Sequence, residues 1–203
     1  MILAGMILAG GLSRRMQGHD KALVQLKGRP LLGHVLARLE PQVSELAVNF
    51  NGAPDRLSGL RLPVCPDTLP GHPGPLAGVL TAMDWAAGLG AERVFTVATD
   101  TPFLPGDFVP RLLLAAEDCE GPVLAASRDG QGALRAHPTC GLWPVTLRGP
   151  LRRALDDGQR RMMGWAEAQG ACLAEFAAPG IDPFFNVNTP EDLARAEALL
   201  AGV

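Results

Sequence analysis

The chain has 203 residues, of which 47% are hydrophobic and 19% are charged, and its formal net charge is −3. This length suits one domain with a full core, and we expect a single domain over residues 1–203. A slightly negative chain lacks the broad positive field with which proteins bind nucleic acid or anionic membranes. No apolar run reaches the roughly 18 residues of a membrane span. The composition therefore indicates a soluble globular protein that acts on small molecules.

Apolar runs and helical patterns alternate in the first half of the chain. In chain order, we expect a strand at 2–9, a helix at 30–39, strands at 46–51 and 62–65, a helix at 76–89 and a strand at 94–98. The helix at 30–39 begins with a proline and has one apolar stripe. Buried strands that alternate with helices are typical of a parallel sheet covered on both faces.

The second half of the chain continues this alternation. We expect a helix at 106–117, a strand at 123–127, helices at 145–157 and 161–169, a strand at 171–176 and a helix at 190–200. Thr189, Pro190 and Asp192 form a capping signal at the start of the last helix. The polar, turn-rich segment 127–139 is expected to form a hairpin or a loop over the site. The predicted fold class is α/β, a three-layer α/β/α Rossmann-like domain with a mostly parallel sheet.

The segment Leu8-Ala9-Gly10-Gly11 is the most informative feature of the chain. The glycine pair follows a predicted buried strand, and glycine allows backbone N–H groups to approach phosphate oxygens closely. Arg15 and Lys21 then supply positive charge, and Lys21 is one of two lysines in the chain. The spacing fits neither the Walker pattern nor the dinucleotide fingerprint. A nucleoside triphosphate is the expected ligand, and the alternative is a glycine pair that only closes a tight turn.

Polar residues follow several of the predicted strands. They are Gly10-Gly11, the segment 49–51, Pro66-Asp67 and Thr99-Asp100. In an open α/β sheet the ligand lies outside the carboxyl ends of the strands, so these residues should meet at one rim. Asp100, at the end of an apolar strand, is a candidate ligand for Mg²⁺ beside a triphosphate. The alternative for Asp100 is a capping role at the next helix.

The four cysteines are scattered through the sequence with no C-x-x-C spacing. Because this spacing is absent, the cysteines indicate neither a zinc site nor a disulfide framework. We therefore expect reduced thiols and a cytoplasmic location.

Five separated segments carry a resemblance to a known family. They are the segment 8–21, Pro66-Asp67, the segment 73–78, Asp100-Thr101-Pro102 and the segment 186–192. Together and in this order, they resemble the molybdenum cofactor guanylyltransferases over nearly the whole chain. That resemblance implies a nucleotidyltransferase domain, Mg²⁺ as the cofactor, and the transfer of GMP from GTP to molybdopterin with release of pyrophosphate. We also expect a monomer that contacts molybdopterin-handling proteins only transiently.

The resemblance also implies roles for individual residues. The catalytic residues would be Lys21, Arg15 and Asp100. The nucleotide would contact Leu8, Ala9, Gly10, Gly11, Lys21, Asn49, Asp67 and Asp100, with Asp67 facing either the guanine or the ribose. The acceptor would contact Gly74, Gly78, Arg160, Arg161, Asn186 and Asn188, and the metal would be held by Asp100 and Asn188. The alternatives are that both asparagines only shape a turn and that the arginine pair is a solvated helix start.

Three other functions compete with this interpretation. A cytidylyltransferase that acts on the same cofactor usually reads L-A-A-G where this chain has Gly10. A sugar-phosphate nucleotidyltransferase shares the first motif but seldom has the string at 186–192. A nucleotide-binding regulator without chemistry would not require both Lys21 and Asp100.

Overall fold

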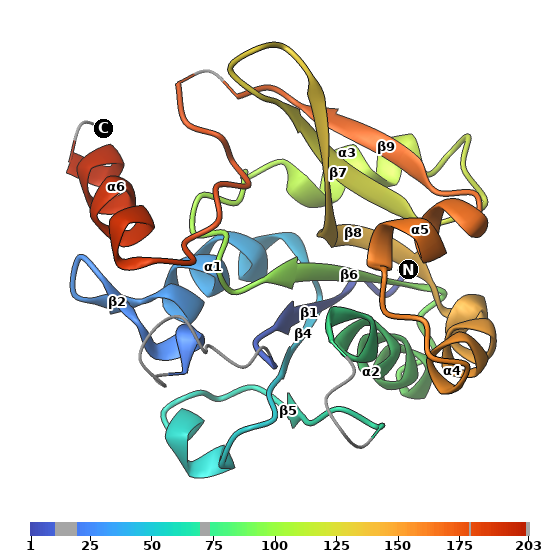
Figure 1. Cartoon of the computed structure of the whole chain (residues 1–203). Coiled ribbons are helices and arrows are strands. Elements are labelled where there is room, and N and C mark those ends of the chain that lie inside the picture. Colours follow the sequence, from blue (N-terminus) through green and yellow to red (C-terminus); the bar gives the residue numbers. More distant parts are fainter. Residues whose placement is uncertain (11–19, 70–73, 179, 202–203) are drawn as a thin grey trace.

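The computed structural model describes residues 1–10, 20–69, 74–178 and 180–201 (Figure 1). Its strands are β1 (Ala4–Leu8), β2 (Gln25–Leu26), β3 (Arg29–Pro30), β4 (Glu45–Asn49), β5 (Val64–Cys65), β6 (Arg93–Ala98), β7 (Val123–Arg128), β8 (Leu134–Pro144) and β9 (Cys172–Phe176). Its helices are α1 (Leu31–Leu39), α2 (Pro75–Gly88), α3 (Phe108–Ala115), α4 (Arg148–Asp156), α5 (Met162–Ala168) and α6 (Pro190–Ala201). Each predicted helix and strand is present. Within the described ranges, none of the helices has the length and apolar character of a membrane span.

The main sheet has the strand order β5-β4-β1-β6-β8-β7-β9. β1 pairs in parallel with both β4 and β6, whereas β8 runs antiparallel to both of its neighbours. The chain leaves β1 toward β4 and β5 and then returns to β6 on the other side of β1. This reversal makes the carboxyl ends of β1 and β6 the switch point at which ligands bind in open α/β sheets. Leu8 and Ala98 are the last residues of these two strands and are partners in the ladder.

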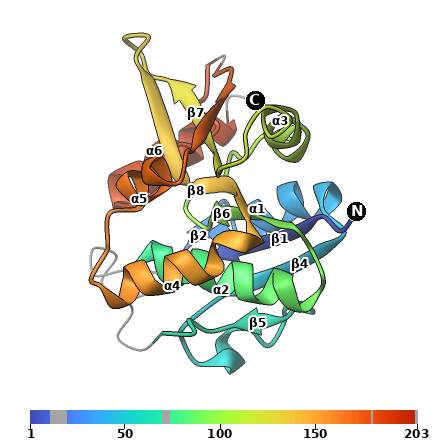
Figure 2. The ribbon, with the colours of Figure 1, turned by 90° about the vertical axis from the view of Figure 1, so that its right-hand side faces the viewer.

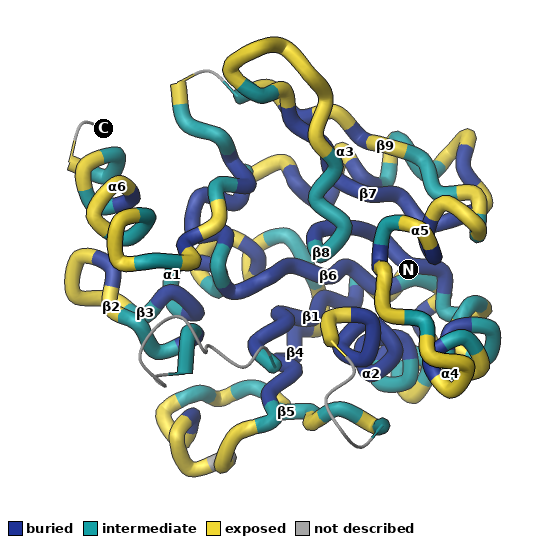
Figure 3. The backbone as a smooth tube through the Cα atoms, in the orientation of Figure 1, coloured by how far each residue is buried: buried dark blue, intermediate teal, exposed yellow. Residues whose placement is uncertain are grey.

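Two apolar layers cover the faces of this sheet (Figure 2). One face packs against α1 and α3, through residues such as Val35 and Phe108. The other packs against α2, α4 and α5, through residues such as Leu80, Leu151 and Trp165. The strands between these layers are mostly buried, whereas the tip of the β7–β8 hairpin is exposed (Figure 3). The predicted three-layer α/β/α class is confirmed.

The last helix packs away from these two layers. Ala196 of α6 shares a small apolar cluster with Leu26, Leu31 and Val187. The predicted capping signal forms, because the Asp192 amide donates to Thr189 Oγ1 at 3.1 Å and Asp192 Oδ2 accepts from the Thr189 amide at 2.9 Å. These reciprocal bonds satisfy donors of the first helical turn and fix the position of the segment before it.

The polar segment 127–139 forms a hairpin rather than a loop. β7 and β8 pair on either side of a turn in which Asp129 accepts from the amides of Gln131 and Ala133. Leu124 is opposite Gly141, but the next pair is Ala125 and His137, so β8 has a bulge at this point. The sequence pattern did not predict β8 as a strand because its first residues are polar and exposed.

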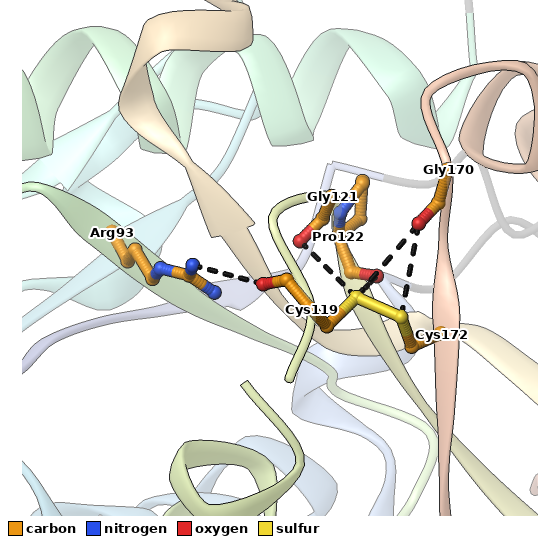
Figure 4. The surroundings of a disulfide bond; sticks show 6 residues. All are labelled: Arg93, Cys119, Gly121, Pro122, Gly170 and Cys172. Carbon is orange, nitrogen blue, oxygen red and sulfur yellow. Dashed lines mark hydrogen bonds between the residues drawn. A yellow bond between two sulfur atoms is a disulfide. The ribbon is translucent and has the colours of Figure 1, made fainter. Parts of the chain in front are cut away.

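The expectation of reduced thiols throughout the chain is wrong. Cys119 and Cys172 form a disulfide, whereas Cys65 and Cys140 are free (Figure 4). The two cysteines are 53 residues apart, so no local spacing announces the bond. They meet because β9 runs parallel to β7, and the ladder pairs Cys172 with Val123 at the start of β7. The bond ties the segment after α3 to an edge strand, and the carbonyl of Cys119 also accepts from Arg93.

Reduction of this disulfide should destabilise the fold. The bond closes a loop of 53 residues, and chain-entropy arguments assign about 4 kcal/mol of unfolding free energy to such a loop. Urea unfolding with and without a dithiol reductant measures the difference. The double variant Cys119→Ser/Cys172→Ser is the control, because its stability should not respond to the reductant. An equal stability of the parent chain under both conditions would contradict the prediction.

Candidate active site

A lysine contacts two polar side chains near the carboxyl end of β6. Lys21 begins a short 3-10 turn, and its Nζ lies 2.6 Å from Asp100 Oδ2, just beyond β6. The same Nζ donates to Asn188 Oδ1. The amide of Val187 donates to the carbonyl of Asp100 at 2.9 Å and so places Asn188 beside the carboxylate. Three predicted site residues from distant parts of the chain, Lys21, Asp100 and Asn188, thus meet at one ammonium group.

The second carboxylate oxygen of Asp100 takes no part in these contacts. Its Oδ1 atom is buried and has no hydrogen-bond partner among the described residues. A buried carboxylate oxygen without a partner is costly, and a cation or a donor that arrives with a ligand would remove that cost. Asp100 and Asn188 both present oxygen atoms, which are the ligands that Mg²⁺ prefers. In the described ranges, no group of three or more His, Cys, Asp or Glu side chains could hold another metal ion.

Asn49, Asn51 and Asp67 form a second polar cluster beside β1. Asn49 Nδ2 donates to Asp67 Oδ1 at 2.9 Å, and Asn51 Nδ2 donates to Asp67 Oδ2 at 2.8 Å. The Asp67 amide donates back to Asn51 Oδ1 at 2.7 Å. Both carboxylate oxygens are thereby fixed in direction. The cluster presents a preorganised set of donors and acceptors, which is what recognition of a planar polar ligand requires.

Two predicted glycines pack against this cluster. A Cβ at Gly10 would lie 2.7 Å from Asn51 Nδ2, and a Cβ at Gly78 would lie 2.8 Å from Asn49 Oδ1. A side chain at Gly10 would therefore force Asn51 to move from its hydrogen bonds, and Gly10 is not among the residues with positive φ. The structure places Gly78, a predicted acceptor residue, beside Asn49 and Leu8, which are predicted nucleotide residues. Gly74 has φ 91° at the start of α2, a conformation that favours glycine.

The remaining predicted residues lie in different surroundings. Leu8 ends β1 and Ala9 follows it, and the carbonyl of Leu8 accepts from the Thr99 amide at 3.2 Å. Asn186 is exposed and lies close before Asn188 in the chain. Gly11 and Arg15 lie outside the described residues.

The predicted arginine pair lies between α4 and α5. Arg160 Nη1 donates to the carbonyls of Leu155 and Gln159, at 2.9 and 2.7 Å, and so caps the end of α4. Arg161 is the exposed N-cap residue of α5, and its guanidinium has no polar partner within the described ranges. Figure 2 shows this connection on the same side of the molecule as α2. The two arginines therefore differ in surroundings. Arg160 is held by hydrogen bonds to backbone carbonyls, whereas the guanidinium of Arg161 is available to a ligand in the described structure.

Asn51 is a site residue to which the sequence analysis assigned no role of its own. Its polar side chain directly after a buried strand was the available signal. Cys140 also lies near the site, with Sγ 4.0 Å from Thr101 Oγ1. Burial raises the pKa of this thiol to about 11, so it is a neutral packing group rather than a nucleophile.

Comparisons with known proteins fit this geometry. The MobA-like NTP transferase domain family matches residues 5–171. The chain belongs to this family. A protein named molybdenum cofactor guanylyltransferase from Cereibacter sphaeroides is 51% identical over 201 residues, which cover 98% of each chain. A protein of the same name from Mesorhizobium japonicum is 47% identical over 203 residues, which cover 98% of this chain and 96% of the relative.

Solved structures share the fold at lower identity. The molybdopterin-guanine dinucleotide biosynthesis protein A from Archaeoglobus fulgidus has a TM-score of 0.76 at 22% identity, over 99% of this chain and 100% of that one. The 2-C-methyl-D-erythritol 4-phosphate cytidylyltransferase from Thermus thermophilus has a TM-score of 0.69 at 23% identity, again over 99% and 100%. The predicted Rossmann-like nucleotidyltransferase fold is therefore confirmed.

An alanine at position 78 should destabilise the chain. The added Cβ would come within 2.8 Å of Asn49 Oδ1 and 3.1 Å of a Leu8 methyl group, and overpacking of this kind costs about 1–3 kcal/mol. Gly88→Ala is the matched control on the same helix, because no atom lies within 4 Å of its added Cβ. That control should be neutral or more stable. Urea unfolding of both variants measures the difference, and equal effects would contradict the packing argument.

Proposed function

We propose that the chain transfers GMP from GTP to molybdopterin. In this reaction a phosphate oxygen of molybdopterin attacks the α-phosphorus of GTP, the bond to the β-phosphate breaks, and pyrophosphate leaves. The carrying observation is the convergence of Lys21, Asp100 and Asn188 at the switch point of the sheet. Membership of the MobA-like NTP transferase family and relatives named molybdenum cofactor guanylyltransferase support the choice of substrates.

The proposal includes a Mg²⁺ ion held by Asp100 and Asn188. The buried Asp100 Oδ1 atom without a partner supports such a site, as does the oxygen donor set that surrounds Lys21 Nζ. Bound Mg²⁺ would neutralise charge on the triphosphate. Because Mg²⁺ on the free Oδ1 atom would offset the negative charge of Asp100, the ammonium of Lys21 would then be able to leave Oδ2 and contact a phosphate oxygen.

Each cluster has a separate task in this proposal. The side chains of Asn49, Asn51 and Asp67 orient the nucleoside by hydrogen bonds from fixed positions. The ammonium of Lys21 stabilises charge that develops on the phosphates during transfer. The chain needs no general base, because the attacking phosphate is already an anion at neutral pH. Positioning and charge neutralisation are thus the contributions of the protein.

The acceptor half of the site is assigned to the segment around Asn186 and to Arg161. Arg161 is exposed and free of polar partners in the described chain, so its guanidinium is available for a phosphate. We also propose that a single chain suffices, because every residue assigned a role comes from the same chain. A cytoplasmic location is proposed from the named relatives and not from the thiols, because Cys119 and Cys172 form a disulfide. Contacts with molybdopterin-handling proteins would then be transient.

Asp100→Asn should keep the fold and remove most of the Mg²⁺-dependent transfer. A neutral amide is a poor replacement for an anionic metal ligand, and we expect turnover to fall at least about a hundredfold. Pyrophosphate release with GTP, molybdopterin and Mg²⁺ measures turnover. Asp84→Asn is the matched control, because Asp84 forms an ion pair with Arg152 away from the site. Turnover of Asp100→Asn within twofold of the parent chain would end the metal assignment.

The same assay tests the choice of nucleotide. The parent chain should release pyrophosphate with GTP and much less with CTP, ATP or UTP. Equal use of GTP and CTP would favour the cytidylyltransferase alternative. Release that does not require molybdopterin would favour another acceptor, such as a sugar phosphate.

Arg161→Ala should weaken molybdopterin binding and leave GTP binding nearly unchanged. The loss of one charged phosphate contact costs about 1.5–3 kcal/mol, or about one to two powers of ten in affinity. Arg160→Ala is the comparison, and its main effect should be on stability, because Arg160 caps α4. Separate titrations of GTP and molybdopterin measure both affinities. An equal loss for the two ligands would move Arg161 to the triphosphate, and no loss would make it a solvated helix start.

A further inference from the structure

A chain of hydrogen bonds joins the β7–β8 hairpin to the segment that leads into α6. Ser127 Oγ of β7 lies 2.8 Å from His137 Nε2 of β8. The same oxygen lies 3.0 Å from Asp182 Oδ1, beyond the end of β9. Asp182 Oδ1 also accepts from the amide of Phe184 at 3.0 Å. Both strands of the hairpin and a segment 55 residues further along the chain therefore meet at the hydroxyl of Ser127.

The direction of these hydrogen bonds follows from the number of protons. A serine hydroxyl has one hydrogen, and an ionised carboxylate can only accept. Ser127 therefore donates to Asp182 and must accept from His137. This assigns the neutral imidazole of His137 as the tautomer with its proton on Nε2. Burial lowers the pKa of His137, and the charge of Asp182 opposes that shift.

The β8 bulge explains why His137 can reach this position. Ala125 pairs with His137 and Leu124 pairs with Gly141, so the residues between them, 138–140, are extra on β8. Bulges redirect side chains near functional sites, and Pro138 fits one because it has no N–H to donate to the ladder. Residues 137–139 thus set the local course of β8 in the hairpin.

Aromatic contacts fix the same segment. The ring of His137 stacks on Phe184, with centroids 4.7 Å apart. Phe184 is 1% exposed and also contacts Phe176 edge-on at 5.2 Å. Aromatic pairs of this kind add to the energy of burial. Asp182 and Phe184 are therefore held by both polar and apolar contacts.

The held segment ends in the candidate active site. The buried Val187 donates its amide to the Asp100 carbonyl, and Asn188 accepts from Lys21. The segment 182–188 is thus fixed to the hairpin at one end and to β6 at the other. The exposed Asn186 lies between these two attachments.

We infer that His137, Ser127 and Asp182 are positioning residues, which hold the segment 182–188 so that Asn186 and Asn188 face the reacting groups. The effect on transfer rests on the proposed function, whereas the effect on the segment does not. None of the three side chains contacts Lys21 or Asp100 in the described residues, so each acts through the backbone of this segment. Loss of these side chains should change the turnover number and the affinity for the acceptor more than the affinity for the nucleotide, whose proposed position is beside Asn49 and Asp67.

Two substitutions at His137 separate the hydrogen bond from the stacked ring. His137→Phe keeps an aromatic ring on Phe184 but leaves Ser127 without its donor. His137→Gln loses the ring but can place an amide N–H near the position of Nε2. We expect His137→Phe to lower the turnover number about tenfold and to raise the Michaelis constant for molybdopterin. The Michaelis constant for GTP should stay within about twofold, and His137→Gln should recover most of the turnover.

Arg135→Gln is the control in the same hairpin, because Asp129 near the turn is the one ion-pair partner that Arg135 has among the described residues. Its turnover should equal that of the parent chain. Asp182→Ala and Asp182→Asn form a second pair, in which only the alanine variant loses the acceptor. An unchanged turnover in both His137→Phe and Asp182→Ala, with an active parent chain, would overturn the catalytic part of the inference.

Two readouts without activity test the positioning itself. Nitrogen NMR of the His137 ring should show a neutral imidazole with its proton on Nε2, and a proton on Nδ1 would contradict the hydrogen-bond chain. Amide hydrogen exchange at Val187 should be at least about tenfold faster in His137→Phe than in Arg135→Gln. Equal exchange in the two variants would overturn the inference. An inactive parent chain with faster Val187 exchange in His137→Phe would instead refute the proposed function alone.

Discussion

The ammonium of Lys21 between Asp100 and Asn188 is the interaction on which the site depends. It brings a carboxylate that follows β6 and a side-chain amide from the segment before α6 to one point. The carboxylate is largely buried, so its charge must be balanced by a nearby cation. One oxygen of Asp100 nevertheless has no partner in the described chain. The fold forms without a ligand, but this carboxylate oxygen is left without a partner. A metal ion bound to a triphosphate would supply that partner.

The order of the strands explains how these groups meet. β1 lies between β4 and β6, so residues that follow these three strands share one rim of the sheet. Asn49 ends β4, Asp100 follows β6, and Gly10 follows β1 and lies against the side chains of Asn49 and Asn51. α6 and its capping residues then fix Asn188 from outside the sheet. The apolar layers on both faces hold the strands rigidly, and polar groups at their ends consequently keep their directions without a ligand.

The sequence predicted the alternation of strands and helices well, because buried strands and amphipathic helices have distinct apolar periods. Lys21, which is one of two lysines, and the polar residues Asn49, Asp67 and Asp100 at the ends of predicted strands were also singled out from the residues alone. Asn188 was named only through the family resemblance. The sequence did not predict the Cys119–Cys172 bond, because only the β7–β9 pairing brings the two cysteines together. The contact of Gly78 with Asn49 and the helix-capping role of Arg160 were equally invisible. Such contacts depend on packing between distant elements, which one sequence does not display.

A crystal structure of the chain with GTP and Mg²⁺ tests the central claim most directly. The account predicts a metal ion about 2.0–2.1 Å from an oxygen of Asp100, the distance typical of Mg²⁺. It also predicts that Lys21 Nζ leaves Asp100 Oδ2, now 2.6 Å away, and contacts a phosphate oxygen. A metal ion bound elsewhere, with the Lys21–Asp100 ion pair intact beside the bound nucleotide, would contradict it.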